Sequence, residues 1–316
     1  MREKNEPTGR IAGRIRSSSV EKAAARLDKL GVGVSLASPA AAVPMSDVQP
    51  VALPSSPAVP SAAAEDANAN RRTSRRVVIN LETMRAAGMV TVSSEQSVIA
   101  EEFRLIKRPL LVKAFAEGPE KIRHGNLIMV TSARAGDGKT FCAVNLAMST
   151  ALERDLTVML IDADVAKPSV ARTLGIEAEL GLTDLIADPS LDLADVLLRT
   201  DIDRLTVLPA GRPDPLATEL LASERMVQFV AEIAARYPDR VIIFDSPPVL
   251  MSTIPSVLAP YVGQIVFVVQ AEASTQASVD AALSLISGCN NISLLLNKAR
   301  DLGGTERFGA YYGYER

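Results

Sequence analysis

The sequence lacks the residues on which several common kinds of site depend. Its 316 residues include no tryptophan, one histidine (His124) and two cysteines (Cys142 and Cys289). A single histidine excludes a metal cluster built from several histidines within the chain. Neither cysteine has a neighbour at the spacing of metal ligands or redox motifs, so no disulfide framework is expected and a reducing compartment fits. We expect Cys142 in the core and His124 in a loop before the first strand.

Long apolar runs are also missing. No stretch approaches the ~20 apolar residues that are needed to span a bilayer. The N-terminus opens with charged and polar residues, and no apolar signal core follows them. We therefore expect a cytoplasmic protein, which a partner would have to bring to any membrane at which it works.

Charge is distributed unevenly along the chain. Residues 1–76 hold 12 Lys/Arg and 7 Asp/Glu, a net charge of +5, which leaves −8 for the rest because the whole chain carries −3. This basic arm could contact an anionic membrane or an acidic partner, but solvated charge in a flexible arm is the favoured interpretation. Within the arm, residues 19–30 predict a short amphipathic helix, either nascent or a docking helix. Residues 32–70 are rich in Ala, Pro and Ser and predict an extended linker.

Beyond the arm, helical and strand patterns alternate. Helices are predicted at 95–115, 141–153 and 217–236, with Pro109 kinking or dividing the first, and small helices between Ser169 and Thr200. Short apolar strands are predicted at 157–161, 205–208, 241–244, 265–269 and 292–296. This order predicts an α/β fold with a parallel sheet flanked by helices, its strands buried on both faces.

A glycine-rich turn lies between an apolar strand that ends near Thr131 and the helix predicted at 141–153. Gly136 and Gly138 permit positive φ and let N–H groups approach an anion. Lys139 would then bring positive charge to the β- and γ-phosphates, and the Thr140 hydroxyl could bind Mg²⁺. Ala133 stands where the P-loop pattern has its first glycine. The candidate nucleotide-binding residues are Ala135, Gly136, Asp137, Gly138, Lys139, Thr140 and Phe141.

Carboxylates follow two of the predicted strands. Asp162 and Asp164 follow the strand at 157–161, and Asp245 follows the strand at 241–244. Ligands bind at this edge of open α/β sheets, and carboxylate oxygens suit Mg²⁺. An aspartate after a strand is, taken singly, more often a helix cap or a turn residue. Two such strand ends together with a P-loop favour a metal site made by Thr140, Asp164 and Asp245.

These three motifs, Ala133–Thr140, Ile161–Asp164 and Phe244–Pro248, resemble the Walker A, A′ and B motifs of bacterial tyrosine kinases. The resemblance covers roughly residues 77–316 and implies a P-loop NTPase-type fold that uses ATP and Mg²⁺. It implies that Lys139 stabilises charge on the phosphates. Asp162 is then assigned to orient or deprotonate the incoming tyrosine and Asp164 to hold the metal, although these two roles could be exchanged. Asn297 matches the family's adenine-contacting asparagine.

The resemblance extends to both ends of this region. Glu101, Arg104 and Lys107 recur at three-residue steps, as in the helix that mediates ring-like self-association in the family. The amino-acid sequence of this helix, together with that of residues 20–30, is similar to the corresponding sequences of the autokinases of exosortase-linked exopolysaccharide loci. Three of the chain's five tyrosines lie in its last six residues, and glycines at 303, 304, 309 and 313 predict a loose tail there. The resemblance implies that these acceptors, Tyr311, Tyr312 and Tyr314, are phosphorylated by a neighbouring subunit; the alternative is an incidental cluster.

Two further positions differ from related proteins. Ala166 stands where the family usually has an arginine, so that the function of the arginine falls to Lys167 or is missing. Arg134 occupies the place of a second, signature lysine in the related division ATPases, and it could serve the same purpose or none.

We therefore expect three regions: a flexible arm at 1–76, a P-loop kinase domain at 77–302, and a tyrosine-rich tail at 303–316. The expected activity is tyrosine autophosphorylation that regulates exopolysaccharide polymerisation or export. The expected partners are further copies of the chain and a membrane polysaccharide co-polymerase, with no nucleic acid. The main alternative is a regulatory ATPase of the division or partition type, and a third is an idle nucleotide-binding scaffold.

Overall fold

The computed structural model describes residues 74–92 and 97–299. The predicted arm helix, the linker and the three tail tyrosines lie outside these residues, so the limits drawn at 76 and 302 stay predictions. No helix in the described ranges is both long and apolar enough to span a membrane.

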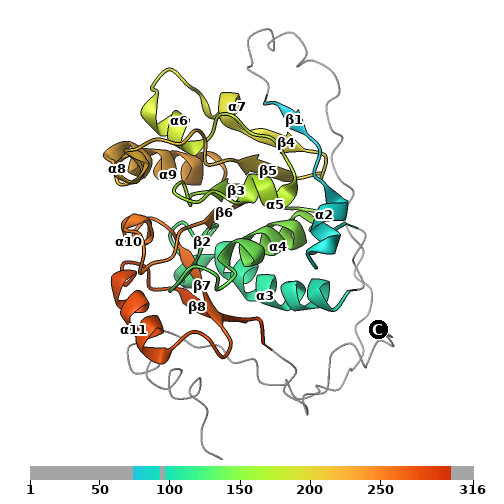
Figure 1. The fold of residues 1–316 in the computed structure, drawn as a ribbon, viewed down its shortest axis with the longest axis vertical. Helices are drawn as coiled ribbons and strands as arrows, with labels where there is room; N and C mark the ends of the chain where they lie inside the picture. Colours follow the sequence, from blue (N-terminus) through green and yellow to red (C-terminus); the bar gives the residue numbers. More distant parts are fainter. Residues whose placement is uncertain (1–73, 93–96, 300–316) are drawn as a thin grey trace, which may run out of the picture. The chain divides into compact units, whose positions relative to one another are not determined.

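The described strands form one sheet in the order β1-β4-β5-β3-β6-β2-β7-β8 (Figure 1). Every neighbouring pair is parallel except β4 and β5, which are antiparallel. This confirms the predicted parallel sheet and the P-loop NTPase-type order. The strands are β1 (Arg76–Val77), β2 (Leu127–Ser132), β3 (Thr157–Asp162), β4 (Leu198–Thr200), β5 (Leu205–Leu208), β6 (Arg240–Asp245), β7 (Gln264–Gln270) and β8 (Ile292–Asn297).

Helices cover both faces of the sheet, as Figure 1 shows. One face carries α2 (Leu81–Ala86), α3 (Val98–Ala114), α4 (Lys139–Ala151) and α5 (Val170–Leu174), and the short 3-10 helix η1 (Gly118–Glu120) precedes β2. The other face carries α6 (Leu182–Ala187), α7 (Leu193–Val196), α8 (Ala217–Leu221), α9 (Glu224–Arg236), α10 (Ile254–Leu258) and α11 (Gln276–Leu285). The three small helices expected between Ser169 and Thr200 are α5, α6 and α7.

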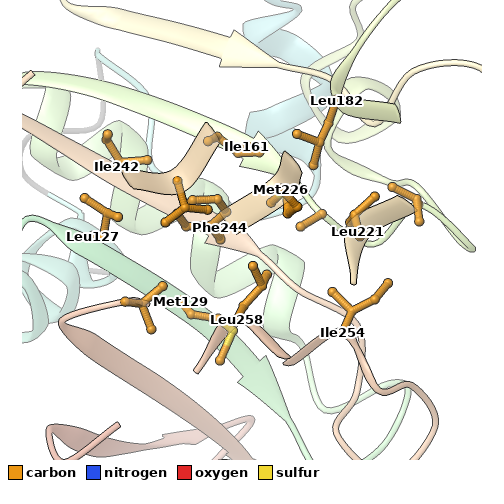
Figure 2. Close-up of a cluster of buried hydrophobic side chains, with 14 of the residues drawn as sticks. Leu127, Met129, Ile161, Leu182, Leu221, Met226, Ile242, Phe244, Ile254 and Leu258 are labelled. Carbon is orange, nitrogen blue, oxygen red and sulfur yellow. The ribbon is translucent and has the colours of Figure 1, made fainter. Parts of the chain in front are cut away.

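The central strands contribute to two cores because successive side chains of a strand point to opposite faces. Met129 and Phe244 lie in the core beneath α6 to α11, which Figure 2 shows. Val130 and Ile243 lie in the core beneath α2 to α5, together with Cys142, as predicted for that cysteine. Burial on both faces explains why β2, β3 and β6 are continuous apolar runs in the sequence.

Two predictions about these elements were wrong, and of the two alternatives at Pro109 a division of the helix is excluded. The helix expected at 217–236 is two helices, because the Ser223 hydroxyl caps a new one by accepting a hydrogen bond from Met226 N–H. Pro109 does not divide α3, which continues through it and packs on α4. Strand β8 is not buried on both faces: it lies at the sheet edge, where Leu296 is 48% exposed.

Lys107 connects α3 to α4 within the chain. Its ammonium group donates to the Ser149 carbonyl at 2.6 Å and lies 2.6 Å from a Glu153 carboxylate oxygen. Ser149 lies in the last turn of α4, where carbonyl groups lack helical partners and a positive charge is favourable. The Lys107 side chain is only 8% exposed. The Lys107 ammonium group is therefore bonded within its own subunit. This corrects the prediction that Lys107 contacts a neighbouring subunit.

Lys107→Met should lower the free energy of unfolding by about 1–3 kcal/mol, because it leaves a buried carbonyl without its charged donor. Urea denaturation followed by circular dichroism measures the loss. Lys121→Met, at an exposed position after η1, is the matched control and should leave the unfolding curve unchanged. Equal stability of the parent and Lys107→Met would show that this contact does not hold α3 in place.

Candidate nucleotide site

The strand register brings the predicted motifs to one edge of the sheet. Asp162 at the end of β3 pairs in register with Asp245 at the end of β6. Asp245 also pairs with Val130 of β2, the strand that leads into the P-loop. On the other side of β2, Gln270 of β7 pairs with Asn297 of β8. Residues far apart in the sequence thus surround the glycine-rich turn.

The turn has the backbone conformation expected of an anion-binding loop. Gly136 has φ +93° and Gly138 has φ +98°, a region that side chains disfavour. Space is open where a Cβ of Gly136 would lie. Gly138 caps α4, so that Lys139 and Thr140 form its first turn, where N–H groups have no helical acceptor. Ala133 is buried and is not among the residues with positive φ, so no glycine is needed there.

Lys139 is directed toward Asp164. Its ammonium group donates to a carboxylate oxygen of Asp164 at 2.7 Å, and the other oxygen accepts from the Lys167 N–H at 3.2 Å. Burial lowers the pKa of Lys139. The negative charges of Asp245, Asp164 and Asp162 raise this pKa by more than burial lowers it, so the pKa lies above the usual value. Lys139 is therefore a fixed positive charge beside the loop.

Thr140 and Asp245 lie together at the centre of the site. The Thr140 hydroxyl donates to one Asp245 carboxylate oxygen at 2.6 Å and lies 3.0 Å from the Ser169 hydroxyl. The other Asp245 oxygen is buried without a hydrogen-bond partner. Burial raises the pKa of Asp245 to about 7, against the attraction of Lys139. An unpaired buried carboxylate oxygen beside a hydroxyl fits the hard oxygen donors that Mg²⁺ prefers.

Asp162 has a different environment from the other two carboxylates. One oxygen accepts from the Ser169 and Val170 N–H groups at 3.0 and 2.9 Å, and the other from the Asp164 N–H at 3.2 Å. Only 1% of the residue is exposed, and burial raises its pKa to about 6 despite these bonds. Asp162 thus fixes the loop between β3 and α5 through its bonds to backbone N–H groups.

The remaining predicted residues lie around the loop. Phe141 is part of α4 and packs edge-on against Phe103, with ring centroids 6.4 Å apart. Asn297 donates its amide N–H to the Asp137 carbonyl at 2.8 Å. Arg134 and Lys167 are exposed at the edge of the site.

Sequence reasoning missed three residues of this edge. The Ser169 N–H and hydroxyl link Asp162 to Thr140, the Ser274 hydroxyl lies 3.3 Å from an Asp137 carboxylate oxygen, and the Lys298 ammonium donates to the Gly136 carbonyl at 2.7 Å. None belongs to a spaced motif. Only the position of Lys298, directly after Asn297, could have drawn attention to it.

Comparisons with known proteins agree with this geometry. A ParA family model, described as NUBPL iron-transfer P-loop NTPase, matches residues 123–191. The kinase domain of Escherichia coli tyrosine kinase ETK superposes with a TM-score of 0.54 at 26% identity, covering 64% of this chain and 77% of that one. Tyrosine-protein kinase YwqD of Bacillus subtilis is 27% identical over 227 residues, which are 71% of this chain and 91% of YwqD.

The chain is similar to named members of the bacterial tyrosine-protein kinase family. Tyrosine-protein kinase wzc of Salmonella typhi is 31% identical over 193 residues, which are 60% of this chain. Those residues are 26% of wzc, so the present chain corresponds to about a quarter of that relative's length. The resemblance to bacterial tyrosine kinases that the Walker A, A′ and B motifs indicated is thereby confirmed.

The two buried carboxylates should respond differently to removal. Asp162→Ala leaves three backbone N–H groups without an acceptor and should lower the free energy of unfolding by about 2–4 kcal/mol. Asp245→Ala should leave the free energy of unfolding at pH 8 almost unchanged, or raise it. Its raised pKa means that the folded state disfavours the charged form, so the cost is present above the folded pKa of about 7 and disappears as the pH falls.

Urea denaturation of the nucleotide-free protein at pH 8 measures both variants. Equal losses would show that the backbone bonds of Asp162 have no special structural importance. A loss for Asp245→Ala alone would reverse the assignment of the two carboxylates.

Proposed function

We propose that the chain is an ATP-dependent protein-tyrosine autokinase that phosphorylates Tyr311, Tyr312 and Tyr314 of a neighbouring copy. The observation that carries the nucleotide site is the pairing of Thr140 with Asp245, whose second oxygen is buried and unpaired at the start of a P-loop helix. Relatives named as tyrosine kinases, which include YwqD over 91% of its length, favour protein tyrosine as the acceptor.

Each side chain has a part in the proposed mechanism. Thr140 and Asp245 would hold the metal ion, and the N–H groups of the glycine-rich turn would hold the phosphates. Bound Mg-ATP supplies the transferable phosphoryl group and a metal charge that offsets the developing negative charge. Lys139, already fixed as a cation, stabilises negative charge on the phosphate oxygens.

Asp164 is the better candidate for receiving the phenol proton, since Asp162 is occupied by backbone N–H groups. This adopts one half of the exchanged assignment, since Asp164 takes the role of proton acceptor while Asp162 is given no metal to hold. A phenol with a pKa of ~10 benefits from a positioned acceptor. The pairing of Asp164 with Lys139 keeps its carboxylate next to the phosphate-binding loop.

The biological setting belongs to the same proposal. The autokinase regulates exopolysaccharide polymerisation or export, as a cytoplasmic protein at the inner membrane bound to a polysaccharide co-polymerase. The names of the relatives describe tyrosine-protein kinases, so this part of the proposal rests on the resemblance to the family. The alternative of a regulatory ATPase shares the P-loop and both aspartate motifs, and differs in transferring nothing to tyrosine.

Lys139→Met should abolish phosphotyrosine formation while the chain stays folded, because it removes the cation beside the phosphates without opening a core cavity. The purified protein is incubated with labelled Mg-ATP, and phosphotyrosine is detected. Lys121→Met is the matched control and should retain the label. Phosphotyrosine at the parental level in Lys139→Met would remove the P-loop from the mechanism.

Mixing two variants, neither of which should become phosphorylated on its own, tests transfer between chains. One carries Lys139→Met and an intact tail; the other has an intact site and phenylalanine in place of Tyr311, Tyr312 and Tyr314. Phosphotyrosine should form only in the mixture. If ATP is hydrolysed and the mixture stays unlabelled, the regulatory ATPase becomes the better assignment.

The proposed subunit contact now involves Glu101 and Arg104, which form an ion pair on α3 and are 34% and 40% exposed. Glu101→Lys places like charges at this contact and should reduce oligomer size, which sedimentation velocity in Mg-ATP measures. The pair itself is exposed, so the fold should lose little stability. Glu117→Lys, exposed outside α3, is the control. Identical profiles for the parent and Glu101→Lys would count against this contact.

A further inference from the structure

Two consecutive carbonyl groups of the glycine-rich turn are bound by two consecutive side chains at the end of β8. The Lys298 ammonium donates to the Gly136 carbonyl at 2.7 Å, and the Asn297 amide donates to the Asp137 carbonyl at 2.8 Å. Both contacts join residues about 160 positions apart in the sequence. Together they fix two successive peptide units of the loop.

Fixing a carbonyl also fixes the N–H of the same peptide unit. The described chain has no cis peptide bond, and in a trans peptide the C=O and N–H point in opposite directions. The Gly136 carbonyl shares its peptide with the Asp137 N–H, and the Asp137 carbonyl shares its peptide with the Gly138 N–H. Within the described residues, neither N–H has an acceptor. Both therefore point away from β8, as donors available to an anion.

The end of β8 is itself held firmly. The Asn297 carbonyl accepts from Ala271 N–H at 2.9 Å, and the Lys298 ammonium also lies 3.3 Å from the Gln270 side-chain oxygen. Lys298 has φ +56°, a conformation that costs a non-glycine residue free energy. The strained backbone at Lys298 accompanies its contact with the loop.

Gly138 makes the approach of Asn297 possible. A Cβ on Gly138 would lie 2.0 Å from the Asn297 amide nitrogen, so any side chain there would displace the amide. Glycine at this position thus leaves room for the Asn297 amide and also permits the positive φ of +98°. The two requirements act at the same residue.

We propose that Asn297 and Lys298 are positioning residues, which hold the Asp137 and Gly138 N–H groups in the orientation that binds nucleotide phosphates. This inference rests on the nucleotide binding of the proposed function and not on transfer to tyrosine. It assigns to Lys298 a function that no sequence motif indicates, and to Asn297 a function other than contact with adenine.

Asn297→Leu and Lys298→Met test the proposal, with Asn291→Leu and Lys121→Met as matched controls. Asn291 lies just before β8 and donates to the Gly263 carbonyl at 3.1 Å, the same kind of contact at the opposite end of the strand. Calorimetry measures the affinity for Mg-ADP. Displacement of a fluorescent ADP analogue measures the affinity for inorganic triphosphate with Mg²⁺.

Each test variant should weaken both ligands by the same factor, about tenfold, since the loss concerns the phosphate donors that the ligands share. The controls should bind as the parent does. Lys298→Arg keeps a charged donor and should restore most of the affinity. The loss should also persist at about 1 M salt, where the Debye length is only about 3 Å, because positioning does not depend on long-range charge.

Several results would overturn the proposal. Asn297→Leu could weaken ADP alone, which would make it an adenine contact. The Lys298→Met loss could vanish at high salt, which would reduce Lys298 to a general positive charge. Unchanged affinity for both variants would refute positioning while leaving the kinase proposal standing, whereas a parent chain that bound neither ligand would overturn both.

Discussion

Three carboxylates are buried around one lysine, and the candidate site depends on how their charges are balanced. Asp162, Asp164 and Asp245 lie at adjacent strand ends, and all three are less than 5% exposed. Buried charges are costly unless they are paired or bound by donors. Lys139 pairs with Asp164, and backbone N–H groups satisfy Asp162. Asp245 alone keeps an unpaired oxygen, which is where a cation is most needed.

The glycine-rich turn is held from both sides of β2. On one side Asp164 and Asp245 bind the side chains of Lys139 and Thr140 at the start of α4. On the other side, the residues that follow β7 and β8 bind its carbonyl groups and Asp137. An arrangement fixed before the ligand arrives needs little reorganisation on binding. The order of strands β3-β6-β2-β7-β8 is what brings both sets of residues to the turn.

Helix α3 has one face that packs inside the chain and one face that is exposed. Its inner face packs on α4 through Phe103 and Leu110, and Lys107 reaches the carbonyl end of α4. Its outer face presents Glu101 and Arg104 and exposed apolar residues such as Leu105, which is 51% exposed. A three-residue step on a helix spans about 300°, so residues at that spacing drift across the surface. That drift explains why Lys107 turns inward while Glu101 remains accessible.

Elements with strong local signals, and the motifs at their ends, could be predicted from the order of residues alone. Continuous apolar runs identified β3, β5, β6 and β7 because both faces of these strands are buried. The sequence could not identify β1 or β4, which have two and three residues and exist only through pairing with neighbours. It also treated β8 as central, since apolar composition does not tell an edge strand from a buried one.

The same division holds for the site. Walker-type spacing identified Lys139, Thr140 and the three aspartates, because local backbone chemistry requires these residue types next to a strand end. Their separate environments were decided by tertiary structure alone: Asp162 accepts backbone N–H groups, Asp164 pairs with lysine, and Asp245 stays half unpaired. The contact of Lys298 with Gly136 joins distant parts of the chain, so only the folded sheet could reveal it. Spacing specifies which groups are present, whereas strand order and register decide what each one touches.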